Sequence, residues 1–471
     1  MMRVLFFKEI REALASRRFL VISALCLFLV PLGFHVSQKS YQAKLQNYKE
    51  AVRIYEEETK TVSDILYNEG GKAFAPPSPL SFLSLGLELV LPNVAETQYK
   101  NMAPPAVMRL SNSQGRDDLY DVFYGSLDLI FVVGVVMSLL AIILTYGSIA
   151  GEKEQGTLKQ VLSNPVARNK IILSKALANG VVLFIPFLIA ITLSLIWANM
   201  QSETWSFLHG DWTLIGVAVF ISILLVGAFL NLGLLISALA KQAVPALVAL
   251  LLVWVFFYGI HPRLSSAAAQ ILYWVKSEGR VALEKSQLQR NIYKELDEEI
   301  DRQIQSLPES RANFPTEEDR RKQDEIRGNY QTRLEQSWRI LDNDVEERRK
   351  FRMALASNIA RLSPTSCFIR ALSEVSRTGW LEYEQFSKQS RQYEELLNRD
   401  IFSRQRVLRH KRGIGVWSEA DVRAPAPAFA YVPVPVEMVL LNILPDVVLL
   451  FLFNLIFFAG ALAAFLRYDV R

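Results

Sequence analysis

Six long apolar stretches constrain this chain more than any other feature of its sequence. They cover residues 19–36, 129–149, 177–197, 214–239, 243–260 and 439–466. A helix of about 20 residues crosses the hydrocarbon core of a bilayer, and regular hydrogen bonding is the only way to satisfy its backbone there. The pattern therefore predicts an all-α polytopic membrane protein with six transmembrane helices.

The basic residues gather next to one side of these stretches. Five precede the first stretch, namely Arg3, Lys8, Arg11, Arg17 and Arg18, and others follow the second and the last stretch. The link 198–213, on the other side, has no Lys or Arg. Because Lys and Arg favour the cytoplasmic face, we expect a multi-pass protein of the cell (inner) membrane with both termini in the cytoplasm.

The N-terminal segment is expected to be an uncleaved membrane anchor and not a cleaved signal peptide. Residues 1–18 have an amphipathic pattern that fits a helix on the inner membrane surface. The first apolar stretch ends in Phe34-His35-Val36-Ser37, which lacks the small residues of a signal-peptide cleavage site. The net charge of +5 does not indicate a nucleic-acid partner, because Lys and Arg near the ends of membrane helices account for it.

Two regions are expected on the outer side, residues 37–128 and 261–438. In the second, apolar residues recur every fourth position at Leu288, Ile292, Leu296, Ile300 and Ile304, which predicts a helix with one apolar stripe. We expect this region to be a large helical domain without strands, interrupted at Pro308 and Pro364. In the first region, the apolar patch Leu80–Leu91 is expected to lie on the outer membrane surface.

The sequence offers no catalytic centre. Hydrolase, metalloprotease and redox motifs are absent, and residues 279–286, the nearest approach to a phosphate loop, have Glu284 where backbone must approach phosphate. The spans carry almost no ionisable residue, which disfavours an ion-coupled secondary transporter. Asn231 and Asn454 are polar but cannot carry protons, and we interpret Asp446 as a helix cap. We therefore expect a non-catalytic chain with no cofactor or metal of its own.

The segment 150–176 lies between the second and third apolar stretches, on the expected cytoplasmic side. Gly156 is expected to break the preceding helix, and Thr157 with Gln160 three residues on has the pattern of a capping box. A short helix is expected to follow and to end at Asn164-Pro165. It would place Leu158, Val161 and Leu162 on one side, and Lys159 and Gln160 on the other. Two interpretations remain open: a helix that seats in a groove of another protein, or an ordinary amphipathic loop.

Residues 151–168, Gly-Glu-Lys-Glu-Gln-Gly-Thr-Leu-Lys-Gln-Val-Leu-Ser-Asn-Pro-Val-Ala-Arg, resemble the hallmark of type-2 ABC exporter permeases. The resemblance implies that 157–163 is a coupling helix docked on a separate ATPase subunit, and that Glu152 and Glu154 line the cytoplasmic gate. The implied ATPase-coupling residues are Glu152, Glu154, Gly156, Thr157, Leu158, Gln160, Val161, Leu162, Pro165 and Arg168.

The same resemblance implies the partners and the energy source. ATP would be bound by a dimer of ABC ATPase subunits, and a second permease protomer, a copy or a relative, would complete the path through the lipid membrane. A looser similarity, at residues 361–364, 379–386 and 465–471, is to a bacterial subgroup with an enlarged outer domain. An envelope protein is a further candidate partner of that domain.

The function expected from these observations is coupling of ATP hydrolysis to export, or to force transmission on an envelope partner. The sequence leaves the cargo open among lipids, peptides, drugs and polysaccharides. The alternative from another class is a membrane-anchored structural or sensory protein whose helical outer domain binds a partner. Six spans argue against it, because one anchor would suffice.

Overall fold

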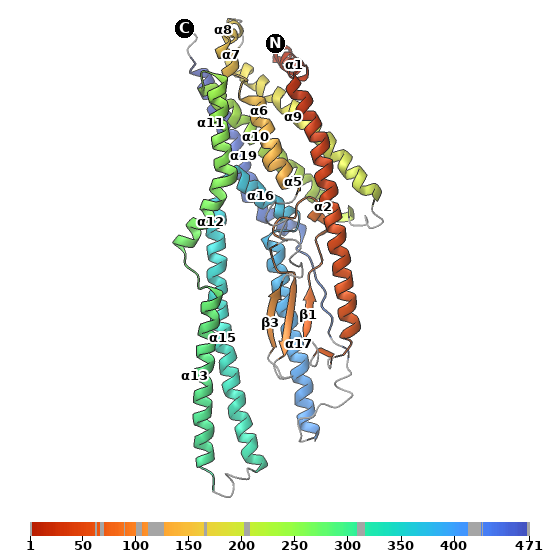
Figure 1. Ribbon diagram of the computed structural model, residues 1–471, viewed down its shortest axis with the longest axis vertical. Coiled ribbons are helices and arrows are strands. Elements are labelled where there is room, and N and C mark those ends of the chain that lie inside the picture. Colours follow the sequence, from red (N-terminus) through yellow and green to blue (C-terminus); the bar gives the residue numbers. More distant parts are fainter. Residues whose placement is uncertain are drawn as a thin grey trace. The chain divides into compact units, whose positions relative to one another are not determined.

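The computed structural model describes residues 2–61, 64–65, 70–88, 90–99, 106–111, 127–163, 167–201, 208–308, 316–412, 425 and 427–468. The chain divides into two compact units. Unit 1 comprises Met1–Gly259 and Ser363–Arg471, and unit 2 comprises Ile260–Leu362. Each unit is described by itself below (Figure 1).

The described residues contain six helical segments that are long and apolar enough to cross a membrane. They are Phe19–Glu58, Leu129–Glu154, Arg168–Ala198, Trp212–Leu239, Ala243–Leu272 and Val436–Leu466. The helices that build them are α2 (Arg17–Glu58), α5 (Leu129–Phe131), the π-helical turn η4 (Val132–Met137), α6 (Ser138–Thr145), α9 (Arg168–Gln201), α10 (Leu208–Leu239), α11 (Ala243–Val255), the π-helical turn η6 (Phe256–Ile260), α12 (His261–Leu272) and α19 (Val436–Leu466). The predicted all-α polytopic membrane fold with six transmembrane helices is confirmed.

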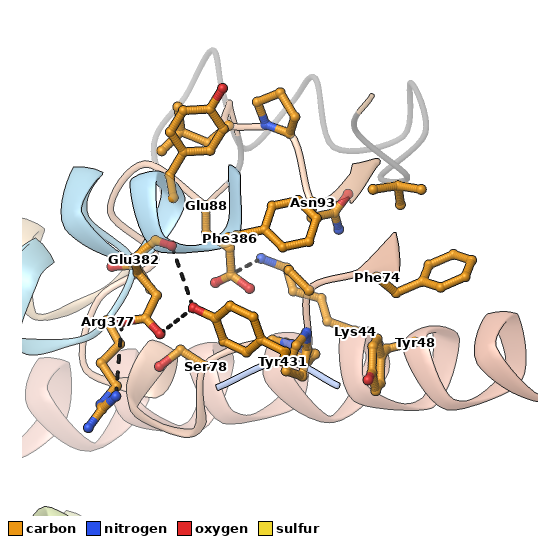
Figure 2. A pocket seen from close by; sticks show the side chains of 18 of the residues that line it. Lys44, Tyr48, Phe74, Ser78, Glu88, Asn93, Arg377, Glu382, Phe386 and Tyr431 are labelled. Atoms are coloured by element: carbon orange, nitrogen blue, oxygen red, sulfur yellow. Dashed lines mark hydrogen bonds and ion pairs between the residues drawn. The ribbon is translucent and has the colours of Figure 1, made fainter. Parts of the chain in front are cut away.

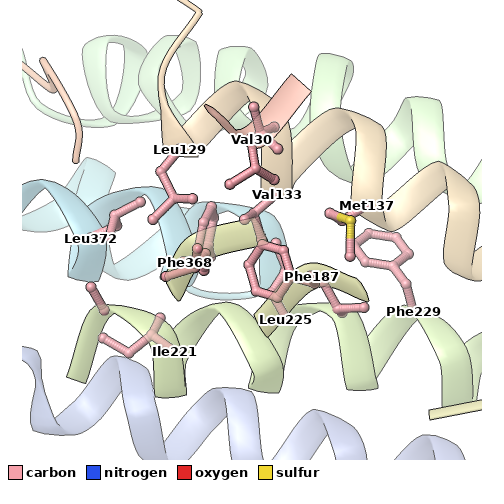
Figure 3. Close-up of a cluster of buried hydrophobic side chains, with 14 of the residues drawn as sticks. Val30, Leu129, Val133, Met137, Phe187, Ile221, Leu225, Phe229, Phe368 and Leu372 are labelled. Carbon is pink, nitrogen blue, oxygen red and sulfur yellow. The ribbon is translucent and has the colours of Figure 1, made fainter. Parts of the chain in front are cut away.

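The core of unit 1 gathers side chains from α2, η4, α9 and α10. Its buried side chains include Val30, Val133, Phe187, Leu225 and Phe229 (Figure 3). Phe368 and Leu372 of α16 (Pro364–Val375) enter the same cluster and are fully buried. A segment expected in the outer region thus packs against α10 and α19, and both apolar and polar side chains of its helix are buried there.

Short strands appear in the region 37–128, where the sequence pattern did not predict them. β1 (Gly71–Phe74), β2 (Val94–Tyr99) and β3 (Ala106–Ser111) form an antiparallel sheet in the order β1-β2-β3. With so few residues each, the strands do not show a clear alternation of apolar and polar residues. The sheet packs beside α17 (Trp380–Arg412) in unit 1 (Figure 1).

Only part of the apolar patch Leu80–Leu91 is exposed, so most of its first half cannot lie on a membrane surface. Its first residues form the 3-10 turn η1 (Pro79–Phe82), and Leu80, Leu83 and Leu85 are each no more than 3% exposed. Leu80 and Leu83 belong to the main core, so the expectation of a surface patch was wrong for these residues. Leu87 and Val90, further along, are exposed.

Asp446 is not a helix cap, as the sequence had suggested. It lies inside α19, one residue after Pro445, and its side chain is fully buried. It pairs with Arg370 of α16, whose guanidinium also donates to the backbone oxygen of Asn442 at 3.2 Å. The partner on α16 explains why a carboxylate is tolerated in the last span, since a buried charge needs an opposite charge and hydrogen bonds.

Unit 2 is a bundle of helices, α12 with α13 (Glu278–Gln305) and α15 (Glu317–Ala360). The predicted apolar stripe faces α15, where Ile292 and Leu296 are buried together with Leu334 and Val345 of α15. Ion pairs join α13 to α15, between Lys285 and Asp342 at 2.6 Å and between Glu295 and Arg333 at 2.8 Å. The range 261–438, expected as one helical region, is therefore divided between unit 2 and unit 1.

Candidate functional site

The segment singled out in the sequence forms two short helices, α7 (Ala150–Glu154) and α8 (Thr157–Leu162). They lie at the end of unit 1 where α1 (Met2–Leu14) and the C-terminal end of α19 also lie (Figure 1). We name residues 150–168 the coupling segment.

The turn between α7 and α8 depends on glycine. Gly156 has φ 73°, in the left-handed region, and it is the residue that precedes α8. Glycine adopts this conformation without the strain that a side chain would add. The predicted capping box of Thr157 and Gln160 was wrong, because Thr157 is the first helical residue and α8 has no side-chain cap. Instead, the Thr157 hydroxyl donates to the backbone oxygen of Glu152 at 3.4 Å.

The apolar side of α8 faces the chain itself. Leu158 is 1% exposed and belongs to a second buried cluster, which also contains Ile149, Ile171, Ile172, Leu234, Ala238, Ala461 and Phe465. Val161 and Leu162 are half-buried against the same cluster. Burying a leucine side chain stabilises by about 1.5–3 kcal/mol. Leu158 therefore anchors α8, while Lys159 and Gln160 are exposed on the other side.

Glu152 takes part in a buried ion cluster. The Lys175 ammonium, on α9, lies 2.7 Å from Oε1 of Glu152 and 3.0 Å from Oε1 of Glu9 on α1. The Lys175 side chain is 4% exposed. Two carboxylates around one ammonium supply the partners that a buried charge requires. The cluster thereby joins α1, α7 and α9.

The next two charged residues of α7 bind the ends of other helices. Lys153 Nζ donates to the backbone oxygens of Ala238 and Ala240, the latter at 3.0 Å, at the C-terminal end of α10. Glu154 Oε2 accepts from the backbone N–H of Ala243 at 3.0 Å, at the start of α11. A cation at a helix C-terminus and an anion at a helix N-terminus both satisfy free backbone groups and complement the helix dipole.

Arg168 links the end of the coupling segment to the last span. Its Nη1 donates to the backbone oxygens of Leu466 and Tyr468, each at 2.9 Å. Pro165, which the resemblance included among the coupling residues, lies outside the described residues. Together, residues of the coupling segment contact α9, α10, α11 and α19, and Lys175 links Glu152 to Glu9 of α1.

Several members of this network were not among the site residues expected from sequence. Glu9 and Lys175 form ion pairs, and Lys153 donates to backbone oxygens at the end of α10. The Ser237 hydroxyl accepts from the backbone N–H groups of Ile149 and Ala150, each at 3.0 Å. A lysine two residues before an apolar stretch is a usable signal for Lys175, because a charge at the end of a spanning helix needs a partner. The sequence has no comparable signal for Ser237.

The polar contacts of the coupling segment are ion pairs and hydrogen bonds that link it to the ends of neighbouring helices. Among the described residues, no group of three or more His, Cys, Asp or Glu side chains could hold a metal ion. Of the charged groups of the segment, Lys153, Glu154 and Arg168 bind the ends of helices, and Glu152 pairs with Lys175. The fold and these contacts together define a polytopic helical membrane protein with a helix-linked segment at one membrane face.

The family of the chain follows from comparison with protein-family models. The model of the ABC-2 family transporter protein matches residues 3–470, nearly the whole chain. The chain belongs to this family and is a type-2 ABC permease, a membrane subunit of an ABC transporter. Comparison with curated proteins gave no match.

Proposed function

We propose that the chain couples ATP hydrolysis by a separate ATPase subunit dimer to export, or to force transmission on an envelope partner. The coupling segment is the site where the ATPase docks. The observation that carries this proposal is the position of α8: its apolar side is anchored in unit 1, and its polar side, with Lys159 and Gln160, is exposed.

The contacts of α7 support a mechanism in which α8 acts as a lever. α8 is attached to α7 through Gly156, and charged side chains of α7 bind α9, α10 and α11 directly. Through Lys175 of α9, the same network reaches Glu9 of α1. A displacement of α8 therefore reaches four helices through hydrogen bonds and ion pairs. A second permease protomer, a copy or a relative, would form the path with this chain, and ATP would be bound only by the ATPase.

The docking surface proposed on this basis is the exposed side of α8. The coupling residues implied by the resemblance also included Leu158, which is buried within the chain. Leu158→Asp would disturb the buried cluster around Leu158, so its effect would combine lost docking with lost anchoring. Lys159→Glu changes an exposed side chain instead. We expect it to weaken co-purification of the ATPase about tenfold, ~1.4 kcal/mol, and to lower transport-coupled ATPase activity, while the permease stays inserted.

Lys294→Glu, an exposed change of the same charge in unit 2, serves as the control and should leave ATPase binding unchanged. Unaltered ATPase binding and activity in Lys159→Glu would contradict docking through this face of α8.

The proposal places the chain in the cell (inner) membrane, with the coupling segment and both termini on the cytoplasmic side. An impermeant maleimide should label Lys159→Cys only after the membrane is opened, and should label Lys294→Cys in intact cells. The two natural cysteines, Cys26 and Cys367, are buried and should contribute little background. Labelling of Lys159→Cys in intact cells would reverse the assigned orientation.

A further inference from the structure

At the other end of unit 1 from α7 and α8, the structure contains a cavity of about 450 Å³. Its wall combines one side of α2, the residues that follow β1 and precede β2, the start of α17, and Tyr431 (Figure 2). Cavities of roughly 300–1,000 Å³ with apolar walls and a few polar groups are typical of small-molecule sites. Nothing in the ATPase-coupling role requires a cavity at this end.

One ion pair in the cavity wall has unused hydrogen-bonding capacity. Lys44 of α2 and Glu88 point toward each other, with Nζ 3.7 Å from Oε2 (Figure 2). Their side chains are only 11% and 16% exposed, and within the described part of the chain neither Nζ nor Oε2 has a hydrogen-bond partner. A buried charge left without hydrogen bonds costs free energy. A ligand that supplied those bonds would recover it.

The other pair of charges near the cavity is already engaged. Glu382 Oε1 accepts from the Tyr431 hydroxyl at 2.6 Å and from the backbone N–H of Val434 at 3.4 Å. Arg377 donates to the backbone oxygen of Val434 at 2.9 Å. Lys44 and Glu88 are thus the charged groups of the wall that are best placed to bind a ligand.

Aromatic rings and prolines form the apolar part of the wall. The residues of these types are Tyr48, Phe74, Pro76, Pro77, Pro92, Tyr383, Phe386 and Tyr431. Phe386 packs edge-on to Tyr431, with ring centroids 6.2 Å apart, and Tyr55 packs edge-on to Phe74 at 5.7 Å. The rings are therefore held by neighbours and present a preformed apolar surface.

We propose that the cavity binds a zwitterionic small molecule with an amine and a carboxylate close together on an apolar body, the chemistry of an apolar α-amino acid. The ligand carboxylate accepts from Lys44, its ammonium donates to Glu88, and its side chain lies on the aromatic wall. Because Lys44 and Glu88 together are neutral, a zwitterion pairs both charges, whereas a ligand with a single charge pairs only one. This proposal does not depend on the proposed ATPase coupling.

The test is calorimetric titration of the full chain, purified in lipid nanodiscs, with L-phenylalanine. The assay is run at about pH 8, above the ordinary carboxyl range. We expect saturable binding of one molecule per chain. N-acetyl-L-phenylalanine and L-phenylalanine amide, which each lack one charge, should bind at least about tenfold more weakly. This comparison uses only the natural chain, so it does not depend on how a variant folds.

Two variants locate the site. Lys44→Met and the nearly isosteric Glu88→Gln should each weaken L-phenylalanine binding about tenfold or more, whereas Lys49→Met, an exposed change on the same helix, should not. Absence of saturable binding, equal binding of both blocked analogues, or unchanged affinity in Lys44→Met and Glu88→Gln would each overturn the proposal. Tighter binding of one singly charged analogue would also overturn it, since it would identify the end of a longer peptide as the ligand.

Discussion

Two buried lysines, one at each end of unit 1, differ in how their charge is satisfied. Lys175 is 4% exposed and lies within 3.0 Å of two carboxylates from two other helices. Lys44 is 11% exposed and lies 3.7 Å from one carboxylate, and no other described residue gives its ammonium a hydrogen bond. A fully paired ammonium joins structural elements, whereas a partly paired one has capacity left for a ligand. The comparison therefore distinguishes the Lys175 cluster, which we propose transmits motion, from the cavity wall around Lys44, which we propose binds a ligand.

The largest effect is expected at the fully paired end. Lys175→Met removes the only cation of the cluster and leaves Glu9 and Glu152 facing each other in a largely buried site. Removing one partner of a buried ion pair costs about 3–5 kcal/mol. We expect a loss of stability of that order, measured by thermal unfolding in nanodiscs, and reduced coupling of ATPase activity to transport.

Lys170→Met is the control for this change, because Lys170 is exposed near the start of the same helix. It should change stability by less than about 0.5 kcal/mol. If Lys175→Met and Lys170→Met were equally mild, Lys175 would not be a structural junction.

A much smaller effect on stability is expected at the other end. The double variant Lys44→Met/Glu88→Met replaces the pair by apolar side chains of similar size. Such replacements are often neutral or stabilising, so we expect a change within about 1 kcal/mol of the natural chain. Thermal unfolding in nanodiscs measures this change as well. If the double variant lost as much stability as Lys175→Met, the proposed difference between the two ends would be wrong.

The smallest effect concerns pH. Burial raises the pKa of Glu88 above its ordinary value of 4.5, and the nearby Lys44 opposes this rise only in part. The folded chain then binds a proton more tightly than the unfolded chain between 4.5 and the raised pKa. Stability should accordingly increase as pH falls through that window and level off below it.

Hydrogen exchange of the backbone around Glu88, followed against pH, measures this local effect. Burial also raises the pKa of Glu374 and Glu382, so part of the slope should remain in Glu88→Gln. A slope that is identical in Glu88→Gln and in the natural chain would show that Glu88 does not contribute.

The amphipathic pattern of the coupling segment could be read from sequence, but not which neighbour its apolar side meets. Alternation of Leu158, Val161 and Leu162 with Lys159 and Gln160 predicts a helix with two faces. Whether the leucines dock on a partner or on the same chain depends on Ile171, Leu234 and Phe465, which are far apart in sequence. The structure buries Leu158 within the chain and leaves the polar face outward.

The part of unit 1 that contains β1–β3 and α16 was the least predictable region. The strands β1–β3 are too short for a periodic signal, and α16 is separated by a long stretch of sequence from the spans it joins. Arg370 and Asp446 show the same limitation: each is an isolated charge in the sequence, and only the packing of α16 against α19 makes them a pair.

The sequence alone determined the six membrane-spanning helices, the apolar stripe of α13 and the break at Gly156. Each follows from properties of neighbouring residues: hydropathy over about 20 positions, helical periodicity and backbone freedom. Only the tertiary structure decided that Lys175 has two partners and Lys44 has one, because those partners come from distant parts of the chain. Pairing of charges across helices depends on how the helices pack, and no local pattern encodes it.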